Sequence, residues 1–168
     1  ESAACRAVLS VMGTEVSEGP VNRGLVLERL AYDAGTPSAI VGAIGAAREN
    51  ARRARETVST ELWECLNTTY IGLAAARMRA TTPHHFFAWV RERATLVAGI
   101  TDSTVSRDDA WHFLVLGRSI ERADMTARLV ATSAIGTAQT SWNTVLRSCG
   151  AYESYVRTYR GVDSDERA

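Results

Sequence analysis

The chain has 168 residues, a length typical of one domain built around a single hydrophobic core. Its 19 basic residues, all of them Arg, balance 19 acidic residues, so the charge gives no reason to expect a nucleic-acid partner or an anionic membrane. No apolar run approaches the roughly 20 residues of a membrane span. Apolar residues make up 46% of the chain, too many for a disordered chain, so we expect a globular domain in the cytoplasm that does not span a membrane.

The cysteines support the same compartment. Cys5, Cys65 and Cys149 are far apart, and none belongs to a Cys-x-x-Cys pair. An odd number without paired spacing argues against a disulfide framework and against a zinc site, so we expect free thiols. The chain begins at Glu1 within a helical pattern, which we interpret as the start of a piece of a longer polypeptide.

Prolines indicate where helices begin. Proline is tolerated in the first helical turn, because its missing N–H has no partner there. Pro20, Pro37 and Pro83 each stand where a helical pattern starts, and Thr36 and Thr82 are the predicted N-caps of two of these helices. We predict six helices, the long third one either straight or kinked, with these approximate limits: Ser2 to Glu15, Val21 to Tyr32, Pro37 to Arg79, Pro83 to Ile100, Arg107 to Ala134, and Trp142 to Tyr159.

Other signals mark the ends of the later helices. The sequence Ser106-Arg107-Asp108-Asp109 resembles a capping box and predicts the start of the fifth helix. Gly150 is a predicted weak point in the sixth, and residues 161–165 are predicted to form a loop.

Two apolar seams predict how the helices pack. Apolar residues in the fifth helix alternate at spacings of three and four: Phe113, Leu116, Ile120, Ala123, Ala127, Val130 and Ala134. The third helix has a similar seam: Ile40, Ile44, Ala47, Ala51, Ala54 and Val58. Such seams face a neighbouring helix. We therefore predict an all-α, antiparallel bundle of about six helices, with residues 1–168 forming one helical domain that is part of a larger one.

The first candidate site is a row of arginines on the third helix. Arg48, Arg52 and Arg55 share one helical face and can hold a carboxylate or a phosphate by forked hydrogen bonds. The alternative is a solvated stripe whose charges are matched on the same helix by two pairs, Glu49 with Arg53 and Arg52 with Glu56. Such pairs stabilise a helix by only about 0.2–0.5 kcal/mol each.

The second candidate lies on the fifth helix. Glu121, Asp124 and Arg128 follow one stripe beside the apolar seam, where an unpaired charge is costly. Arg128 is the expected partner of Asp124, and Glu121 is expected to find Arg118 or an Arg of another helix. The stripe is either a network that sets helix register or a pair of catalytic carboxylates.

Other chemistry has little support. Glu28-Arg29 and Glu92-Arg93 are interpreted as ordinary helix surface. His84 and His85 are adjacent, so on a helix they diverge by about 100° and cannot chelate one metal ion. No nucleophile motif, phosphate loop or dinucleotide fingerprint is present. We expect no metal and no cofactor in this chain.

Two stretches resemble the alpha-E family, a bacterial all-helical domain named for its Glu-Arg motif. Its long-helix signature is matched by Ala46-Ala47-Arg48-Glu49-Asn50-Ala51-Arg52, Arg55-Glu56, Trp63 and Asn67. Its Glu-Arg helix is matched by Gly117-Arg118, Glu121-Arg122-Ala123-Asp124 and Arg128. The resemblance extends from about Val21 onward. Family members are longer, which implies that an N-terminal helix and a C-terminal half are missing here.

The resemblance implies a function that residue patterns alone do not. Alpha-E domains occur beside, or fused to, circularly permuted ATP-grasp proteins, and with transglutaminase-like and peptidase-like proteins. It therefore implies an accessory module of an amide-forming (peptide) ligase system, which binds the ligase or its peptide substrate through the matched residues. ATP and magnesium are expected on the ligase. The alternatives are an enzyme that uses Glu121 or Asp124, and a purely structural bundle.

Overall fold

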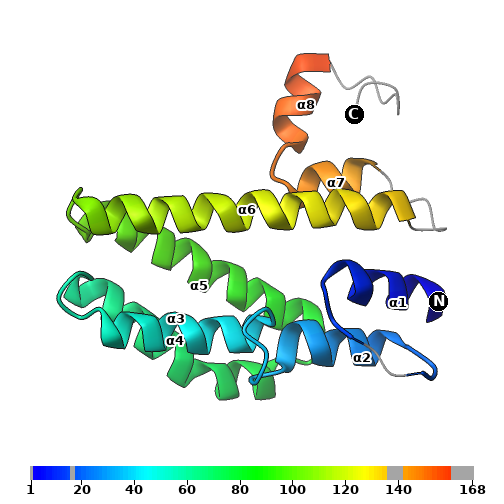
Figure 1. Cartoon of the computed structure of the whole chain (residues 1–168), viewed down its shortest axis with the longest axis horizontal. Helices are drawn as coiled ribbons and strands as arrows, with labels where there is room; N and C mark the ends of the chain where they lie inside the picture. The colour runs from blue at the N-terminus through cyan, green and yellow to red at the C-terminus, as the bar shows by residue number, and fades with distance from the viewer. Residues whose placement is uncertain (1, 16–17, 136–141, 160–168) are drawn as a thin grey trace. The chain divides into compact units, whose positions relative to one another are not determined.

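A computed structural model describes residues 2–15, 18–135 and 142–159, and this part of the chain is helical with no strand. The helices in chain order (Figure 1) are α1 (Ser2–Val11), α2 (Arg23–Leu27), the π-helix η1 (Glu28–Tyr32), α3 (Ile40–Arg53), α4 (Thr60–Arg79), α5 (Pro83–Thr104), α6 (Asp109–Ile135), α7 (Trp142–Ser148) and α8 (Tyr152–Tyr159). The all-α prediction is confirmed.

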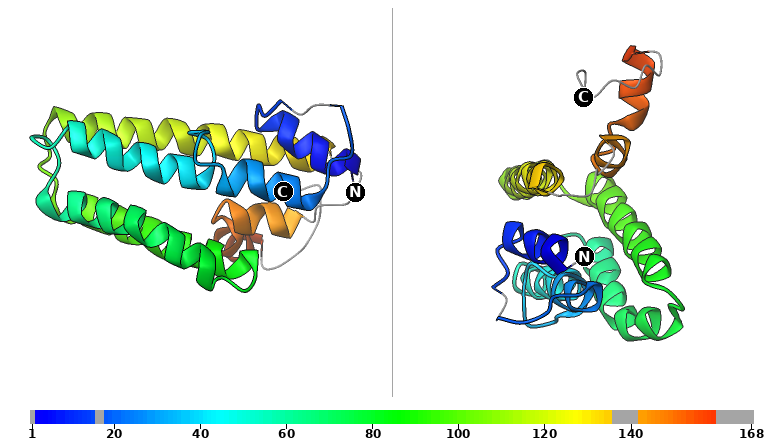
Figure 2. Two further views of the ribbon diagram at one scale, coloured as in Figure 1. Left: turned by 90° about the horizontal axis from the view of Figure 1, so that it is seen from below. Right: turned by 90° about the vertical axis from the view of Figure 1, so that its right-hand side faces the viewer.

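The chain divides into two compact units. The first, here called the hairpin unit, is Leu27–Val115; the second, the terminal unit, combines Glu1–Val26 with Leu116–Ala168. In the hairpin unit α3 packs on α4, α4 packs on α5, and η1 packs on α3 (Figure 2). The core of this unit is formed by Ala31, Leu73 and Phe86, of which Phe86 is only 1% exposed.

The third predicted helix is in fact two helices. The α-helix stops at Arg53, and a turn leads to Ser59, whose hydroxyl accepts a hydrogen bond from the backbone N–H of Leu62 at 3.1 Å. Thr57 turns its own hydroxyl back to the Ala54 carbonyl at 2.9 Å. Short hydroxyl side chains compete for backbone groups in this way, which favours turns and N-caps over helix interiors. The single helix from Pro37 to Arg79 was therefore a wrong prediction, and α3 and α4 form a hairpin.

Two of the three prolines do not begin a helix. The N-cap of α3 is Ala39, three residues after Thr36, whose hydroxyl donates to Asp33 at 2.8 Å. Upstream of α2, the side chain of Asn22 accepts from Leu25 N–H at 2.9 Å, two residues beyond Pro20. Only Pro83 stands in a first helical turn, after the N-cap Thr82.

The later helices follow their local signals. Asp108, rather than Ser106, accepts a hydrogen bond from the Trp111 backbone N–H at 3.2 Å, just ahead of α6. The sixth predicted helix is divided into α7 and α8 at Gly150, whose φ of +68° is costly for other residues. The weak point was thus correct but the count of about six helices was too low. The predicted loop 161–165 lies outside the described residues.

The two predicted seams differ in their exposure. On α6 the seam is exposed, with Phe113 at 74% and Ile120 at 59%. The α3 seam instead packs in the hairpin unit, where Ile40 and Ile44 lie against the core formed by Ala31, Leu73 and Phe86. Consecutive helices joined by short turns provide the close packing partners there, which periodicity alone does not specify.

Candidate functional site

The α3–α4 hairpin places Arg48 against three side chains of α4. Arg48 Nε donates to Asn67 Oδ1 at 2.8 Å. Its Cζ atom lies 4.8 Å from the centre of the Tyr70 ring and 5.8 Å from that of Trp63. The guanidinium is thus half-buried and fixed by one hydrogen bond and two aromatic faces.

Arg55 lies over the same Trp63 ring. It follows the end of α3, and its Cζ atom is 4.7 Å from the centre of the Trp63 ring. A cation over an aromatic ring is stabilised by about 0.5–1 kcal/mol at an exposed position and by more when water is excluded. Trp63 therefore holds two guanidinium groups together. We call Arg48, Arg55, Trp63, Asn67 and Tyr70 the hairpin surface.

The third member of the predicted row has a different role. Arg52 turns back to Glu49, with Nε to Oε2 at 2.8 Å, and does not reach forward to Glu56 as predicted. Arg53 also donates to Glu49 at 2.8 Å, which confirms the other predicted pair. The hydrogen bond from Arg52, which has the larger effect, and the one from Arg53 lower the pKa of Glu49 to about 2. The predicted row therefore divides into two parts. Arg52 is neutralised by Glu49 on the exposed side, whereas Arg48 and Arg55 lie over the ring of Trp63.

Arg48 and Arg55 keep their charge available. Among the described residues, the ion pairs on this part of α3 all involve Glu49, and neither Arg48 nor Arg55 takes part in one. The only hydrogen bond of Arg48 uses Nε, so both terminal nitrogens of the fork remain open within the described part of the chain. The edge of a planar fork that is formed by its two terminal nitrogens matches the two oxygens of a carboxylate. Asn50 and Glu56, two further predicted binding residues, are exposed nearby.

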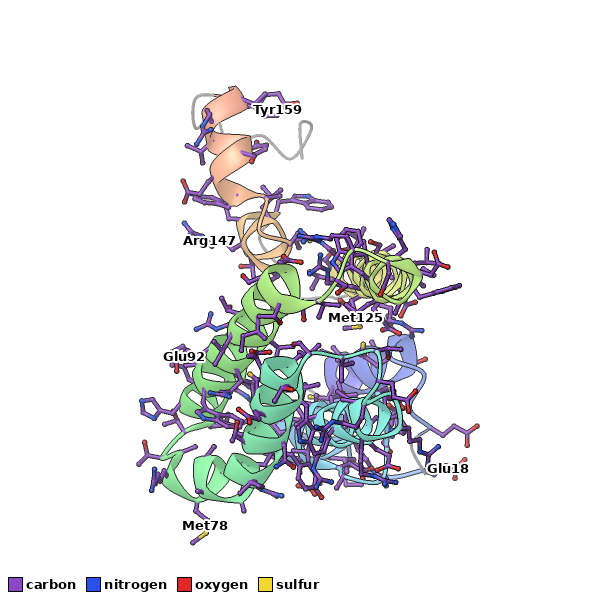
Figure 3. All side chains as sticks on the ribbon, turned by 90° about the vertical axis from the view of Figure 1, so that its left-hand side faces the viewer. Glu18, Met78, Glu92, Met125, Arg147 and Tyr159 are labelled. Carbon is purple, nitrogen blue, oxygen red and sulfur yellow. The ribbon has the colours of Figure 1, made fainter. Side chains whose placement is uncertain are left out.

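A hollow adjoins the hairpin surface. It has a volume of about 450 Å³, and its lining is mainly apolar: Ala34, Val41, Gly45, Tyr70, Ile71, Leu73, Ala74 and Arg77. We call it the hairpin hollow. Arg77 lies with its Cζ atom 4.4 Å from the centre of the Tyr32 ring, and its Nη2 is 3.4 Å from Glu28. Figure 3 shows Met78, next in sequence, projecting away from the helices, so the C-terminal end of α4 presents both apolar and charged groups.

Sequence reasoning missed Tyr70, Gly45 and Arg77. A signal was present, because apolar, aromatic and polar residues of α4 repeat at spacings of four and three: Trp63, Asn67, Tyr70, Ala74 and Arg77. These positions share one helical face. This face of α4 becomes part of the candidate site only because the break before Ser59 lets α4 fold back along α3.

The Glu-Arg motif lies on α6, where its residues make contacts within the terminal unit. Arg128 Nε donates to Asp124 Oδ2 at 2.7 Å, as predicted, and its Nη1 donates to the backbone carbonyl of Val11 at the end of α1. The hydrogen bond from Arg128 to Asp124 is the main cause of the raised pKa of Arg128, and the Glu121 charge adds to it. Within the terminal unit, Asp124 and Arg128 therefore fix the C-terminal end of α1.

The position of Glu121 differs from the prediction. Its side chain was expected at the edge of a core, but it is exposed, and its charge acts on Arg128 of the same helix. Arg122 lines two hollows on this part of α6, one with Ala123, Ala127 and Val130, and the other beside the end of α7. The structure thus places Glu121 and Arg122 on an accessible face.

A third Glu-Arg pair is less superficial than predicted. Glu92 is exposed and points outward in Figure 3, but Arg93 is half-buried between α5 and α4. Arg93 Nε donates to Thr69 Oγ1 at 2.9 Å, and its Nη2 lies 3.4 Å from the Cys65 carbonyl oxygen. Its interpretation as helix surface was wrong, because the Thr69 hydroxyl and the backbone of α4 provide partners that only the folded hairpin unit brings near.

Comparison with known proteins identifies one family. Residues 1–167 match the model of Alpha-E, described as a predicted alpha-helical domain with a conserved ER motif. The match includes the first twenty residues, to which the resemblance in the sequence had not extended. No curated protein and no solved structure matches the chain. None of the described helices has the combination of length and apolarity that crossing a membrane requires.

Proposed function

Because the chain belongs to the Alpha-E family, we propose that it is a non-catalytic interaction module of an ATP-dependent amide-forming system, which binds an ATP-grasp ligase or its peptide substrate through the hairpin surface. The observation that carries the proposal is the state of Arg48. This guanidinium is half-buried and held by Asn67, Tyr70 and Trp63, and within the described chain it has no carboxylate partner.

The energetics favour a binding role over a structural one. A guanidinium that is withdrawn from water is normally compensated by a carboxylate. Here the compensation is partial, because the aromatic faces and one amide oxygen leave the outer edge of the fork open. A partner carboxylate would complete the set of hydrogen bonds without any rearrangement of the protein. Preorganisation of this kind strengthens binding, since little side-chain entropy remains to be lost.

In this proposal the chemistry belongs to the partner. The ATP-grasp protein, fused or separate, holds ATP and magnesium, and transglutaminase-like and peptidase-like proteins act on the same substrates. The free cysteines Cys5, Cys65 and Cys149 support a reducing compartment, and we place the system in the cytoplasm. The exposed Glu121, Arg122 and Ile120 of α6 form a second contact surface for the ligase.

Co-purification tests the proposal. The full-length protein is expressed with the ATP-grasp protein encoded beside it, and the fraction of ligase retained is measured together with ATP-dependent ligation. We expect Arg48→Ala plus Arg55→Ala to reduce at least one of the two by about tenfold or more, because each charged hydrogen bond contributes about 1.5–3 kcal/mol.

The matched control is Arg53→Ala on the same helix. Arg53 is 74% exposed and pairs with Glu49, so its loss removes one positive charge without touching the hairpin surface. Circular dichroism confirms that each variant is folded. If the Arg48 and Arg55 variant retains the ligase and supports ligation as well as the Arg53 variant does, the hairpin surface is not the interface.

A further inference from the structure

We propose that the hairpin surface and the hairpin hollow together form a binding site for the free C-terminus of a peptide. The terminal α-carboxylate binds the open edge of Arg48, and the apolar side chain of the last residue enters the hollow. The inference rests on the proposed function and specifies the ligand that this surface takes.

Tyr70 connects the two parts of the site. Its ring lies under the Arg48 guanidinium, with the centroid 4.8 Å from Cζ, and it also lines the hollow. On the α3 side, Gly45 lines the hollow and Arg48 follows three residues later. Side chains at this spacing on a helix are about 5–6 Å apart. The cation and the apolar space are therefore neighbours on one surface.

That separation suits a single amino-acid residue. In the last residue of a peptide, the α-carboxylate and the side chain leave the same carbon atom, so both reach such neighbouring sites at once. The side chain of an internal Asp or Glu carries its carboxylate further out and would require the apolar contact to come from another residue. The geometry therefore favours a terminal carboxylate over an acidic side chain.

The cation that lines the hollow, Arg77, already has partners of its own. Arg77 lies 3.4 Å from Glu28 and over the ring of Tyr32, so its charge is partly neutralised. Arg48 has no such partner among the described residues. The carboxylate is accordingly assigned to Arg48, and Arg77 lines the hollow together with Ala74.

The lining selects an apolar side chain. Val41, Leu73, Ala74 and the ring of Tyr70 offer carbon atoms, and Ile71 at the rim is 67% exposed. Gly45 adds no side chain on the α3 side, where a Cβ would lie in ordinary van der Waals contact with the Tyr70 ring, 3.6 Å from Cε2. Burying an apolar side chain is favourable by about 25 cal/mol per Å². Leu, Met or Phe at the C-terminus fits this lining.

Peptide titration of the purified full-length chain tests the assignment. The probes are acetyl-Ala-Ala-Leu as the free acid, the same peptide as its C-terminal amide, acetyl-Ala-Ala-Gly as the free acid, and an amidated peptide with an internal Glu-Leu. We expect the free acid ending in Leu to bind at least about tenfold more tightly than the other three by calorimetry, since it alone gains both the charged hydrogen bonds and the apolar burial.

Two matched pairs of variants locate the site. Arg48→Gln should abolish the preference for the acid over the amide, whereas Arg53→Gln should leave it unchanged. Ala74→Leu should fill the hollow and remove the preference for Leu over Gly, whereas Ala75→Leu, on the neighbouring face of α4, should not. Equal binding of acid and amide, or an unaltered preference in Ala74→Leu, overturns the proposal, and tight binding of the internal Glu-Leu peptide overturns its terminal carboxylate.

The peptide titration and the co-purification test can fail independently of each other. If no peptide binds but Arg48→Ala plus Arg55→Ala still releases the ligase, the hairpin surface contacts the ligase itself and this inference is wrong. If the peptides bind as predicted but neither the ligase nor the ligation depends on the surface, the peptide site is correct and the proposed function fails.

Discussion

Arg48 and Asn67, 19 residues apart in sequence, are joined across the α3–α4 hairpin by a hydrogen bond of 2.8 Å. In one continuous helix the same two residues would be separated by about 28 Å, at 1.5 Å per residue. The contact therefore exists only because the chain reverses between Arg53 and Ser59. It orients the guanidinium on which both proposals depend.

Removing the amide should loosen this arrangement without unfolding the hairpin. We expect Asn67→Ala to lower the free energy of unfolding by about 1 kcal/mol, because it leaves the half-buried Nε of Arg48 without a partner. Urea denaturation measures the change. Asn50→Ala is the control, since Asn50 is exposed on α3 and its replacement should alter stability by less than about 0.5 kcal/mol. Equal effects of the two substitutions would show that the hydrogen bond contributes nothing.

Gly42 controls how the chain enters α3. A Cβ at this position would lie 2.0 Å from the backbone carbonyl oxygen of Thr36, and Gly42 is buried. Gly42→Ala must therefore displace the 33–39 turn, and we expect a loss of about 2 kcal/mol or more. The matched control is Gly99→Ala in α5, where nothing lies within 4 Å of the added Cβ. That substitution should be neutral or stabilising by about 0.5–1 kcal/mol.

Much of the helical structure could be predicted from local signals. Pro83 after Thr82 does begin α5, and Gly150 with its positive φ does end α7. The break between α3 and α4 was missed because no proline or glycine marks it. It depends on Thr57 and Ser59, whose hydroxyl groups take backbone partners, and such residues are common enough in helices that their presence alone is not decisive.

The candidate site could be predicted only in part. Arg48 and Arg55, predicted to share one helical face, both lie over the Trp63 ring, and Asn67, which the family resemblance includes, accepts a hydrogen bond from Arg48. The spacing of charges predicted the wrong partner for Arg52. On a helix, this residue can form an ion pair either with Glu49, three residues before it, or with Glu56, four residues after it. The free energies of these choices differ by only tenths of a kcal/mol, so sequence cannot decide between them.

Glu49 should titrate at an unusually low pH. Hydrogen bonds from Arg52 and Arg53 lower its pKa from 4.5 to about 2. A carboxyl group whose pKa is lower in the folded state stabilises the fold above its ordinary pKa, and this contribution is lost as the pH falls from 4.5 toward 2. An NMR titration should therefore show a midpoint near 2 for Glu49 in the folded protein.

The variants that test this titration lie in the same cluster. Arg52→Gln plus Arg53→Gln should return the midpoint of Glu49 toward its ordinary value, and Glu49→Gln should reduce the loss of stability between pH 4.5 and 2. The effect on stability is expected to be small, since the pair is exposed and screened by solvent. An ordinary Glu49 midpoint in the unmodified protein would contradict the structure of this cluster.

Substitution of Asp124 tests whether this residue positions Arg128 or has a catalytic role. It holds Arg128, whose Nη1 donates to the Val11 carbonyl at the C-terminus of α1, where a cation also interacts favourably with the helix dipole. We expect Asp124→Asn to release this guanidinium and to accelerate hydrogen exchange of the backbone amides of α1, measured by mass spectrometry.

The control for this experiment is Glu121→Gln. Glu121 is exposed and acts on Arg128 only through its charge, so its loss should leave the exchange of α1 close to that of the unmodified protein. Arg128→Lys should resemble Asp124→Asn, because an ammonium group cannot reach the carboxylate and the carbonyl with the geometry of a planar fork. If α1 exchanges at the same rate in all four proteins, Asp124 does not act through Arg128 on this helix, and its carboxylate becomes a stronger candidate for chemistry of its own.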